Sequence, residues 1–502
     1  MNSHMKWGAI LAYANLFAKT VAQLLYIPLL VQLLGKEEYG IYTVALSVAS
    51  YLTILNLGID SSYIHFFSKA ATDKNPNATS KLNATYLTIF VTLGALALVV
   101  GFGLTMALHW IFPDFTVGQI DHMRSMLVLL TINVALSFPL GLFNSYVVAH
   151  EKHIVVKLTA LLISILNPVI SILALLFGGG AIVVVAVTVA TNIISYLIMA
   201  VYAITVLKFR LQMTKGQHSS MKGILSFSYL IFIQIIAEQT NWNIDKILLG
   251  RYKDPGAVAV YGIASQLQTM YMSIALAISG LFTPRIHRLV TEKAHQEVNA
   301  LFIKVGTVQF LVLGLVMSGF ILFGRTFIQL WVGLEYSDAY IIALLLMLPA
   351  TVDLIQNTGI EIQRAMGLQK DRAIVYAIVS VLNLMISIPL CKIWGGIGCA
   401  VGTAVSFLVC NILYMNFYYK KKMHLDIGAF WKAITKMAAP TVAVAVFGYV
   451  LQRNVHINNF MTLGIGAIVY TIFYFVANMI TNPQLRKFVV DIFARKNRAQ
   501  KT

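Results

Sequence analysis

The chain has 502 residues, of which 59% are hydrophobic and only 11% are charged, and its formal net charge is +18. Its mean hydropathy is +0.78, and soluble domains carry about 25% charged residues, so these values exclude an ordinary soluble protein and indicate an integral membrane protein. In such a chain the basic residues between apolar spans set the orientation in the membrane, so the positive charge does not indicate a nucleic-acid partner.

Apolar segments follow one another along the whole chain, and each has about the 20 residues that a helix needs to cross the hydrocarbon core. Uninterrupted runs are typical of helices, because the strands of a membrane barrel alternate in hydropathy over about ten residues. We therefore predict an all-α integral membrane protein of about 14 transmembrane helices. The predicted spans are 8–33, 40–67, 82–111, 124–149, 154–177, 181–207, 223–249, 256–282, 299–323, 338–363, 373–394, 396–419, 431–451 and 457–480.

Basic residues are concentrated in every second connection. If the side that holds the N-terminus is the inner side, the inner segments carry 28 Lys and Arg residues and the outer loops carry seven. This bias is typical of cytoplasmic segments and predicts that both termini are cytoplasmic. The end of the chain, 484–502, has an apolar helical face flanked by basic residues. It predicts a helix on the anionic inner leaflet, with a solvated basic end as the alternative.

The sequence gives little sign of catalytic or metal-binding chemistry. Cys391, Cys399 and Cys410 lie in or beside apolar segments, where we expect small core residues and no disulfide framework. The sequence has no phosphate-binding loop, no zinc-ligand spacing and no nucleophile elbow. We therefore expect no enzyme activity, no metal and no cofactor.

An offset of about 216 residues aligns similar stretches of the two halves. Six spans separate the copies, and an even number preserves orientation, which indicates a parallel repeat about an axis normal to the membrane. The repeat predicts two pseudo-symmetric six-helix lobes, at 1–210 and 211–422, followed by two further spans over 423–483 and the basic tail. The matched pairs are Met5-Lys6 with Met221-Lys222, Leu33-Leu34-Gly35 with Leu248-Leu249-Gly250, Asn167 with Asn383, Ser171 with Ser387, and Gly179-Gly180 with Gly395-Gly396.

Several short motifs resemble a transporter family. Tyr39-Gly40-Ile41-Tyr42 and Asn56-Leu57-Gly58-Ile59, with Pro28 and Leu34-Gly35 before them, are similar to the first two helices of polysaccharide-repeat-unit flippases of the Wzx type in the MOP superfamily. The turn Gly395-Gly396-Ile397-Gly398 is similar to another turn of that family.

This resemblance implies a V-shaped, two-lobed flippase in the bacterial inner membrane. It implies as substrate an undecaprenyl-pyrophosphate-linked oligosaccharide that moves from the inner to the outer leaflet, as in the assembly of O-antigen and other lipopolysaccharide chains. Other polysaccharide-assembly proteins are the implied partners. Coupling to sodium, to protons or to the membrane potential is left open.

A lysine lies where an apolar span should carry none. Lys19 is near the middle of the first span, and it shares one helical face with Asn15 and Gln23 at spacings of four residues. A lysine at a helix centre costs roughly 2.5 to 3.5 kcal/mol on insertion scales, so we expect this face to line a water-filled cavity. We predict that its ammonium attracts a lipid-linked pyrophosphate, and a structural ion pair with Asp60 or Glu238 is the alternative.

A second polar stripe runs along the seventh span, with Gln234, Glu238, Asn241 and Asp245 at spacings of four, three and four residues. The candidates for ion coupling are Glu238, Asp245 and, in the tenth span, Asp353. A partner role for Glu238 toward Lys19 is equally compatible with the sequence. The predicted cavity lining comprises Lys19, Asn15, Gln23, Asp60, Glu238 and Asn241, with a basic inner rim of Arg285, Arg288 and Arg364.

Three functions compete at this point. The first is the lipid-linked oligosaccharide flippase, which would work by alternating access of the two lobes. The second is a MATE-like cation-coupled small-molecule or multidrug antiporter, whose cavity we expect to be acidic or apolar rather than to hold a lysine. The third is a membrane-bound glycan polymerase or ligase, which needs a larger outer loop than the chain provides.

Overall fold

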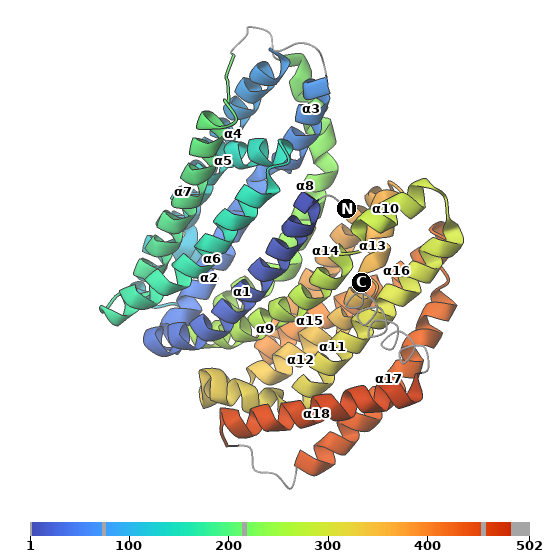
Figure 1. Ribbon diagram of the computed structural model, residues 1–502. Coiled ribbons are helices and arrows are strands. Elements are labelled where there is room, and N and C mark those ends of the chain that lie inside the picture. Colours follow the sequence, from blue (N-terminus) through green and yellow to red (C-terminus); the bar gives the residue numbers. More distant parts are fainter. Residues whose placement is uncertain (1–2, 73–76, 213–217, 453–457, 483–502) are drawn as a thin grey trace. The chain divides into compact units, whose positions relative to one another are not determined.

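The computed structural model describes residues 3–72, 77–212, 218–452 and 458–482 (Figure 1). In these ranges the chain is built from helices and contains no strand, which confirms the predicted all-α class. The predicted membrane-surface helix over 484–502 lies outside the described residues.

Helices occupy all the predicted spans, and some spans are interrupted. The first six are α1 (Ser3–Leu34); α2 (Lys36–Leu52) with η1 (Thr53–Asn56) and α3 (Ile59–Thr72); α4 (Ala78–Ile111); α5 (Val117–Ala149); α6 (His153–Leu176); and α7 (Ala181–Thr205). The next six are α8 (His218–Tyr252); α9 (Pro255–Gly280); α11 (His295–Val332); α12 (Ala339–Ile355) with α13 (Asn357–Ala365); α14 (Gln369–Trp394); and α15 (Gly396–Phe407) with η3 (Leu408–Tyr414) and α16 (Met415–Lys422). The last two are α17 (Ile427–Gln452) and α18 (Phe460–Thr481), and the short elements α10 (Thr283–Thr291) and η2 (Leu334–Tyr336) flank α11.

The number of helices that qualify as membrane spans is close to the predicted one. Ten helices in the described ranges are long and apolar enough to cross a membrane, and the bent pair α12–α13 makes eleven if it is one span. The remaining predicted spans are α1, α8 and α9. The described side chains of α1 give only the apolar segment Ala18–Leu34, and only the described part of α8 enters this comparison. Polar side chains interrupt the apolar run of α9, so the predicted count of fourteen is approximate.

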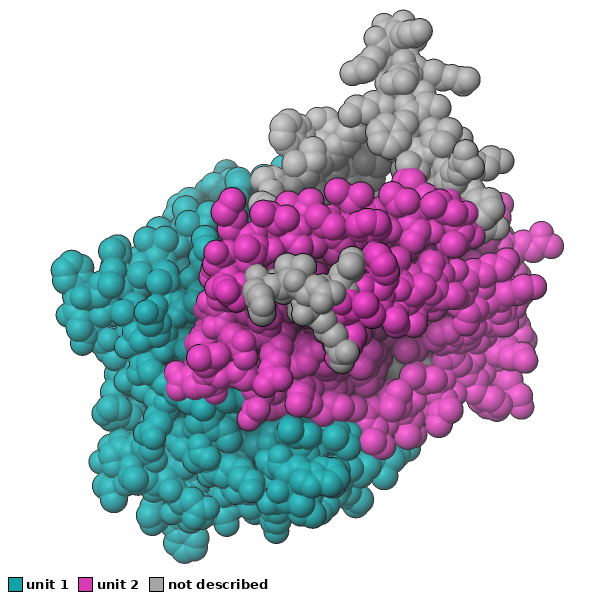
Figure 2. Space-filling view, turned by 90° about the horizontal axis from the view of Figure 1, so that it is seen from below, with its two compact units in different colours: residues 1–262, 370–402 teal, residues 263–369, 403–502 magenta. Residues whose placement is uncertain are grey.

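The chain separates into two compact units, which Figure 2 colours teal and magenta. Unit 1 comprises residues 1–262 and 370–402, and unit 2 comprises residues 263–369 and 403–502. Packing therefore groups α8 and α14 with the first six spans. The predicted lobes over 1–210 and 211–422 are defined by the repeat, and their boundary stays a prediction.

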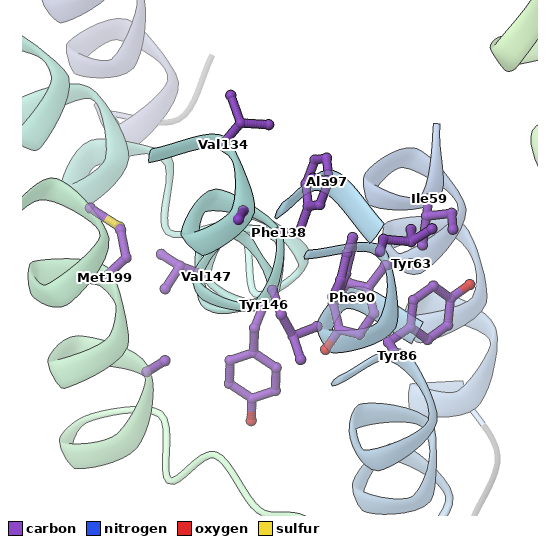
Figure 3. Close-up of a cluster of buried hydrophobic side chains, with 14 of the residues drawn as sticks. Ile59, Tyr63, Tyr86, Phe90, Ala97, Val134, Phe138, Tyr146, Val147 and Met199 are labelled. Carbon is purple, nitrogen blue, oxygen red and sulfur yellow. The ribbon is translucent and has the colours of Figure 1, made fainter. Parts of the chain in front are cut away.

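The core of unit 1 is an aromatic cluster between α3, α4, α5 and α7 (Figure 3). Tyr63, Tyr86 and Phe90 are fully buried, and the rings of Tyr63 and Tyr86 meet edge to face with their centroids 5.0 Å apart. The hydroxyl of Tyr63 donates to Oδ1 of Asn83 at 2.7 Å. Large rings thus fill the space between the helices, and their polar ends find partners as burial requires.

In unit 2 the long helix α11 packs against α12, α17 and α18. Phe302 of α11 stacks on Phe430 of α17 with the ring centroids 4.7 Å apart. Tyr474 of α18 is fully buried, and its hydroxyl donates to the carbonyl of Leu311 at 3.0 Å. These contacts attach the two C-terminal spans to α11.

Two spans are interrupted at positions that are not prolines. The second span is interrupted where Leu57 and Gly58 take positive φ angles of 53° and 73°. The tenth span bends by 45° between α12 and α13, at Gln356, although Pro349 lies inside α12 without ending it. The breaks thus coincide with left-handed backbone in one case and with an amide side chain in the other.

The two repeat-related asparagines both join neighbouring helices in unit 1. Asn167 of α6 donates to the hydroxyls of Thr188 and Thr191 of α7, at 3.2 and 3.0 Å. Asn383 of α14 donates to Oδ1 of Asn241 of α8 at 3.4 Å and accepts from the hydroxyl of Ser387. Amide side chains are suited to this role, since each offers both donors and an acceptor.

Candidate functional site

The predicted cation lies on an open side of α1. This helix packs against α6 and α2, and it buries Ile27, Leu30 and Val31. Lys19 is exposed and Gln23 is half-buried, whereas the side chain of Asn15 is outside the described set. The lysine is thus not enclosed in the packing of unit 1.

The structure does not form the ion pair that was the alternative for Lys19. Among the described residues, Lys19 makes no ion pair with Asp60 or Glu238. Asp60, at the start of α3, instead accepts from Nδ2 of Asn56 at 2.7 Å and from the hydroxyl of Ser145 of α5 at 3.2 Å. Asp60 is half-buried, and it ties α3 to α5 rather than to α1.

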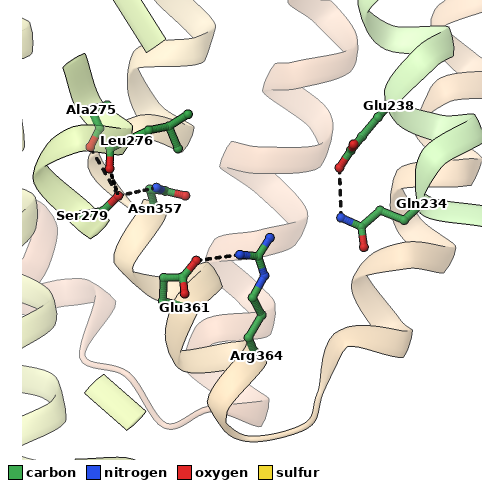
Figure 4. A network of polar contacts seen from close by, with 8 residues as sticks. All are labelled: Gln234, Glu238, Ala275, Leu276, Ser279, Asn357, Glu361 and Arg364. Carbon is green, nitrogen blue, oxygen red and sulfur yellow. Dashed lines mark hydrogen bonds and ion pairs between the residues drawn. The ribbon is translucent and has the colours of Figure 1, made fainter. Parts of the chain in front are cut away.

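Glu238 is the exposed acid of the α8 stripe. One carboxylate oxygen accepts from Nε2 of Gln234, one helical turn earlier, at 2.9 Å (Figure 4). An exposed carboxylate with one neutral donor remains accessible to a proton or a cation. This placement suits the predicted coupling role.

Further along α8, the side chains of the stripe are buried in contacts with neighbouring helices. Asn241 is buried against Asn383 of α14, and Asp245 is only 3% exposed. The hydroxyl of Tyr261 of α9 donates to Oδ2 of Asp245 at 2.5 Å. The thiol of Cys399 lies 3.9 Å from the backbone carbonyl oxygen of Asp245. The C-terminal half of the stripe therefore holds α8 to α9, α14 and α15.

The predicted basic rim belongs to unit 2. Arg285 and Arg288 of α10 are exposed, and Nε of Arg288 lies 3.8 Å from Oε1 of Glu292. Nη1 of Arg364 lies 2.8 Å from Oε1 of Glu361 on α13 (Figure 4). Both pairs join residues three or four positions apart and are partly exposed, so each contributes little to stability.

Asp353, the remaining coupling candidate, is half-buried in the last turn of α12. Next to it, Asn357 donates to the hydroxyl of Ser279 of α9 at 2.7 Å (Figure 4). This bond joins α13 to α9 at the point where the tenth span bends. Asp353 therefore lies beside a buried interhelical contact within unit 2.

A second polar network at this bend was not found from the sequence. Oδ1 of Asn416 accepts from Nε2 of Gln356 at 2.8 Å and from Nε1 of Trp431 at 3.0 Å. The three side chains come from the α12–α13 break, α16 and α17, so no spacing along the chain connects them. The sequence offered one indication of this network, which is the amide side chain at the α12–α13 break and another just after η3.

The predicted lining residues fall into both units. Within unit 1 the structure brings Asp60 to Ser145, Glu238 to Gln234, and Asn241 to Asn383, and it leaves Lys19 separate from the acids. A lining shared by the two halves stays a prediction. Among the described residues, no group of three or more His, Cys, Asp or Glu side chains could hold a metal ion.

Comparison with known proteins identifies the family. A family model described as "Polysaccharide biosynthesis protein" matches residues 6–290, from α1 to α10. The chain belongs to this family. The match spans more than half of the chain, and it confirms the family that the motifs of the first two spans indicated. A search of curated protein sequences found no match.

Solved structures share the fold at low identity. The lipid II flippase MurJ in its inward closed conformation has a TM-score of 0.77 and 16% identity over 95% of this chain and 99% of its own. An inward-facing multidrug resistance MATE family transporter of the MOP superfamily has a TM-score of 0.63 and 13% identity over 84% and 99%. The bent form of the Vibrio cholerae MATE transporter VcmN has a TM-score of 0.54 and 15% identity over 86% and 95%.

At these identities the likeness concerns the fold. The chain shares its fold with these MurJ and MATE proteins, and it is a multi-pass membrane protein. These fold neighbours are named as a flippase and as transporters.

Proposed function

We propose that the protein is a flippase that moves undecaprenyl-pyrophosphate-linked oligosaccharide repeat units from the inner to the outer leaflet by alternating access. The observation that carries this proposal is membership of the polysaccharide biosynthesis family in a chain that shares its fold with a lipid II flippase. A polysaccharide pathway and a membrane transporter fold together call for a lipid-linked glycan as the cargo.

Lys19 is the residue that we assign to the pyrophosphate. Its ammonium is exposed on α1 and has no ion pair among the described residues, so its charge is available to an anionic headgroup. A cation that borders water in a low-dielectric surround attracts anions over a longer range than one in bulk solvent. Gln23 and Asn15 would add neutral hydrogen bonds, and Asp60, Asn241 and Glu238 would line the sugar path.

Arg285, Arg288 and Arg364 are assigned to the inner entrance. Exposed guanidinium groups on α10 and α13 suit capture of a phosphate at the cytoplasmic surface. The polyprenyl chain would stay in the bilayer while the sugar crosses through the aqueous cavity.

The driving force is assigned to an ion gradient or to the membrane potential. Outward movement of a negative charge gains about 2.3 kcal/mol per 100 mV when the inside is negative. For coupling to sodium or protons, Glu238 is the most accessible candidate, because Asp245 is buried under Tyr261 and Asp353 is half-buried.

In this proposal the protein lies in the bacterial inner membrane with both termini in the cytoplasm, in agreement with the charge bias of the loops. O-antigen or a related polysaccharide is the product, and the other polysaccharide-assembly proteins of the same pathway are the partners.

A MATE-like antiporter is the second candidate. It is favoured by the fold shared with MATE transporters and by the exposed Glu238, which could attract a cationic drug. An exposed lysine on α1 disfavours cationic cargo, so we rank this function second.

One experiment separates the two. Cells that lack the gene are complemented with the wild-type chain, and both surface glycan and efflux of a cationic dye are measured. Restored surface glycan, together with loss of the lipid-linked intermediate from the inner leaflet, is the expected result. Restored dye efflux without any change in glycan would favour the antiporter and end the flippase proposal.

A further inference from the structure

The turn between α14 and α15 brings two cysteines of unit 1 toward each other. The carbonyl of Cys391 accepts from the amide of Gly395 at 2.8 Å, and the amide of Cys399 donates to the carbonyl of Gly395 at 3.1 Å. In a continuous helix a separation of eight positions would place the two cysteines about 12 Å apart along the axis. Gly395 has a φ of +57°, however, so the chain reverses between them.

Contacts between the two helices show how tightly the turn closes. A Cβ atom placed on Gly398 of α15 would overlap the carbonyl of Leu390 of α14, and it would lie 3.0 Å from the amide nitrogen of Cys391. One turn later, a Cβ on Gly402 would overlap the hydroxyl of Ser387. The first two turns of α15 therefore lie directly on the last turns of α14, and only glycine permits this approach.

Both cysteines lie inside this contact. Cys391 and Cys399 are fully buried, and the chain next to Cys399 reaches the backbone of Cys391, since a Cβ on Gly398 would lie 3.0 Å from the amide nitrogen of Cys391. Both are free thiols, as is Cys410, which lies in η3 of unit 2. Two cysteines that oppose each other across a tight turn satisfy the main requirement for a disulfide, which is close approach of the two backbones.

We propose that Cys391 and Cys399 form a reversible intramolecular disulfide when the protein meets a two-electron thiol oxidant. The two S–H bonds break and one S–S bond forms, and two electrons and two protons pass to the oxidant. With diamide as the oxidant, its N=N bond takes up both and becomes a hydrazine, so the reaction balances.

This disulfide would fix the start of α15 to the end of α14. The chain passes from unit 1 to unit 2 after Gly402, only three residues beyond Cys399. Cys399 also contacts the backbone of Asp245, whose carboxylate accepts from Tyr261. The disulfide would therefore hold the segment that leads from unit 1 into unit 2 close to Asp245 of α8. Reduction of the disulfide would release this segment.

The test counts oxidised cysteines in the full-length protein. Membranes are treated with diamide, free thiols are blocked with N-ethylmaleimide in denaturant, and the protein is then reduced and labelled with a polyethylene-glycol maleimide that shifts its mobility on a gel. We expect two labels after diamide and none without it. Trypsin cuts after Lys392, so the oxidised protein should also release a peptide ending at Lys392 that is linked to one containing Cys399, which mass spectrometry detects.

Matched variants identify the pair. Cys410→Ser should still gain two labels, whereas Cys391→Ser and Cys399→Ser should gain none. The proposal is overturned if the wild-type chain gains no label, if Cys391→Ser still gains two, or if oxidation yields a cross-linked dimer on a non-reducing gel. The experiment needs no transport measurement, so its result is independent of the proposed function.

Discussion

The helices α1 and α8 are equivalent in the predicted repeat, yet their polar stripes differ in how far their side chains have partners within the protein. On α1 the charged residue is Lys19, which is exposed and has no ion pair among the described residues. On α8 the acids and amides have partners: Glu238 with Gln234, Asn241 with Asn383, and Asp245 with Tyr261. The charge on α1 thus remains available to a ligand, whereas most polar groups of α8 are bonded to other groups of the protein.

This difference indicates that α1 serves substrate recognition and that α8 mainly serves helix packing. A charge inside a span is costly, so an available one indicates contact with water or with an anionic ligand. A polar group bonded to a neighbouring helix instead contributes to packing and fixes its register. We therefore assign substrate contact to α1, and we assign structure, with coupling at the exposed Glu238, to α8.

The strongest challenge to this assignment is removal of the lysine charge. Lys19→Ala should lower glycan export by about a hundredfold, equivalent to about 2.7 kcal/mol, because the predicted span 8–33 contains no other Lys or Arg. Lys19→Arg should keep part of the activity, and Lys69→Ala, an exposed lysine of α3, serves as the matched control. Surface glycan is measured at equal expression, and full export by Lys19→Ala would remove the anion site.

The support role of α8 can be tested through the repeat-related asparagines. Asn383 is 1% exposed and bonds Asn241, whereas Asn167 is half-buried. Asn383→Ala should lower the free energy of unfolding by about 1.5 kcal/mol and Asn167→Ala by about 0.5 kcal/mol. Thermal unfolding in detergent measures both, and equal losses would contradict the proposed difference between the two helix pairs.

A third test concerns the exposed acid of α8. Glu238→Gln removes the charge but keeps an oxygen that can accept from Gln234. We expect about fivefold lower export, or about 1 kcal/mol, and a loss of its dependence on an imposed sodium or proton gradient. Glu292→Gln, on the exposed end of α10, is the control. If gradient dependence survives in Glu238→Gln, coupling lies elsewhere.

The smallest expected effect comes from the partner of Glu238. Gln234 donates a hydrogen bond that is exposed to solvent, and such bonds contribute little. Gln234→Ala should change the free energy of unfolding by about 0.5 kcal/mol or less and should leave export within about twofold of wild type. A larger loss would mean that Glu238 must be held in one orientation to act.

Much of this architecture could be predicted because hydropathy and charge act over whole segments. The spans are continuous runs of apolar residues, and bilayer thickness fixes their length. The stripes that contain Lys19 and Glu238 were predictable because a helical period places residues three and four apart on one face. Single charges inside apolar runs indicated which helices carry candidate functional residues.

Pairings between distant segments could not be predicted in this way. Nothing in the sequence around Asp60 indicates Ser145 as its donor, and nothing around Asn416 indicates Gln356 and Trp431. These contacts depend on how helices pack and where they break, which local spacing does not encode. The approach of Cys399 to Cys391 could not be predicted for the same reason. The chain reverses at Gly395, so two residues eight positions apart come close together.

The interruption of the second span has a mechanical consequence. The left-handed backbone at Leu57 and Gly58 stops the regular ladder of main-chain hydrogen bonds between α2 and α3. α8 covers the gap, since a Cβ on Gly58 would overlap Ile231, and Nε2 of Gln239 lies 3.4 Å from the hydroxyl of Thr53. The start of α3 is therefore not fixed by main-chain hydrogen bonds to α2, and its position depends instead on the contact of Asp60 with Ser145 of α5 and on the packing of α8 over the break.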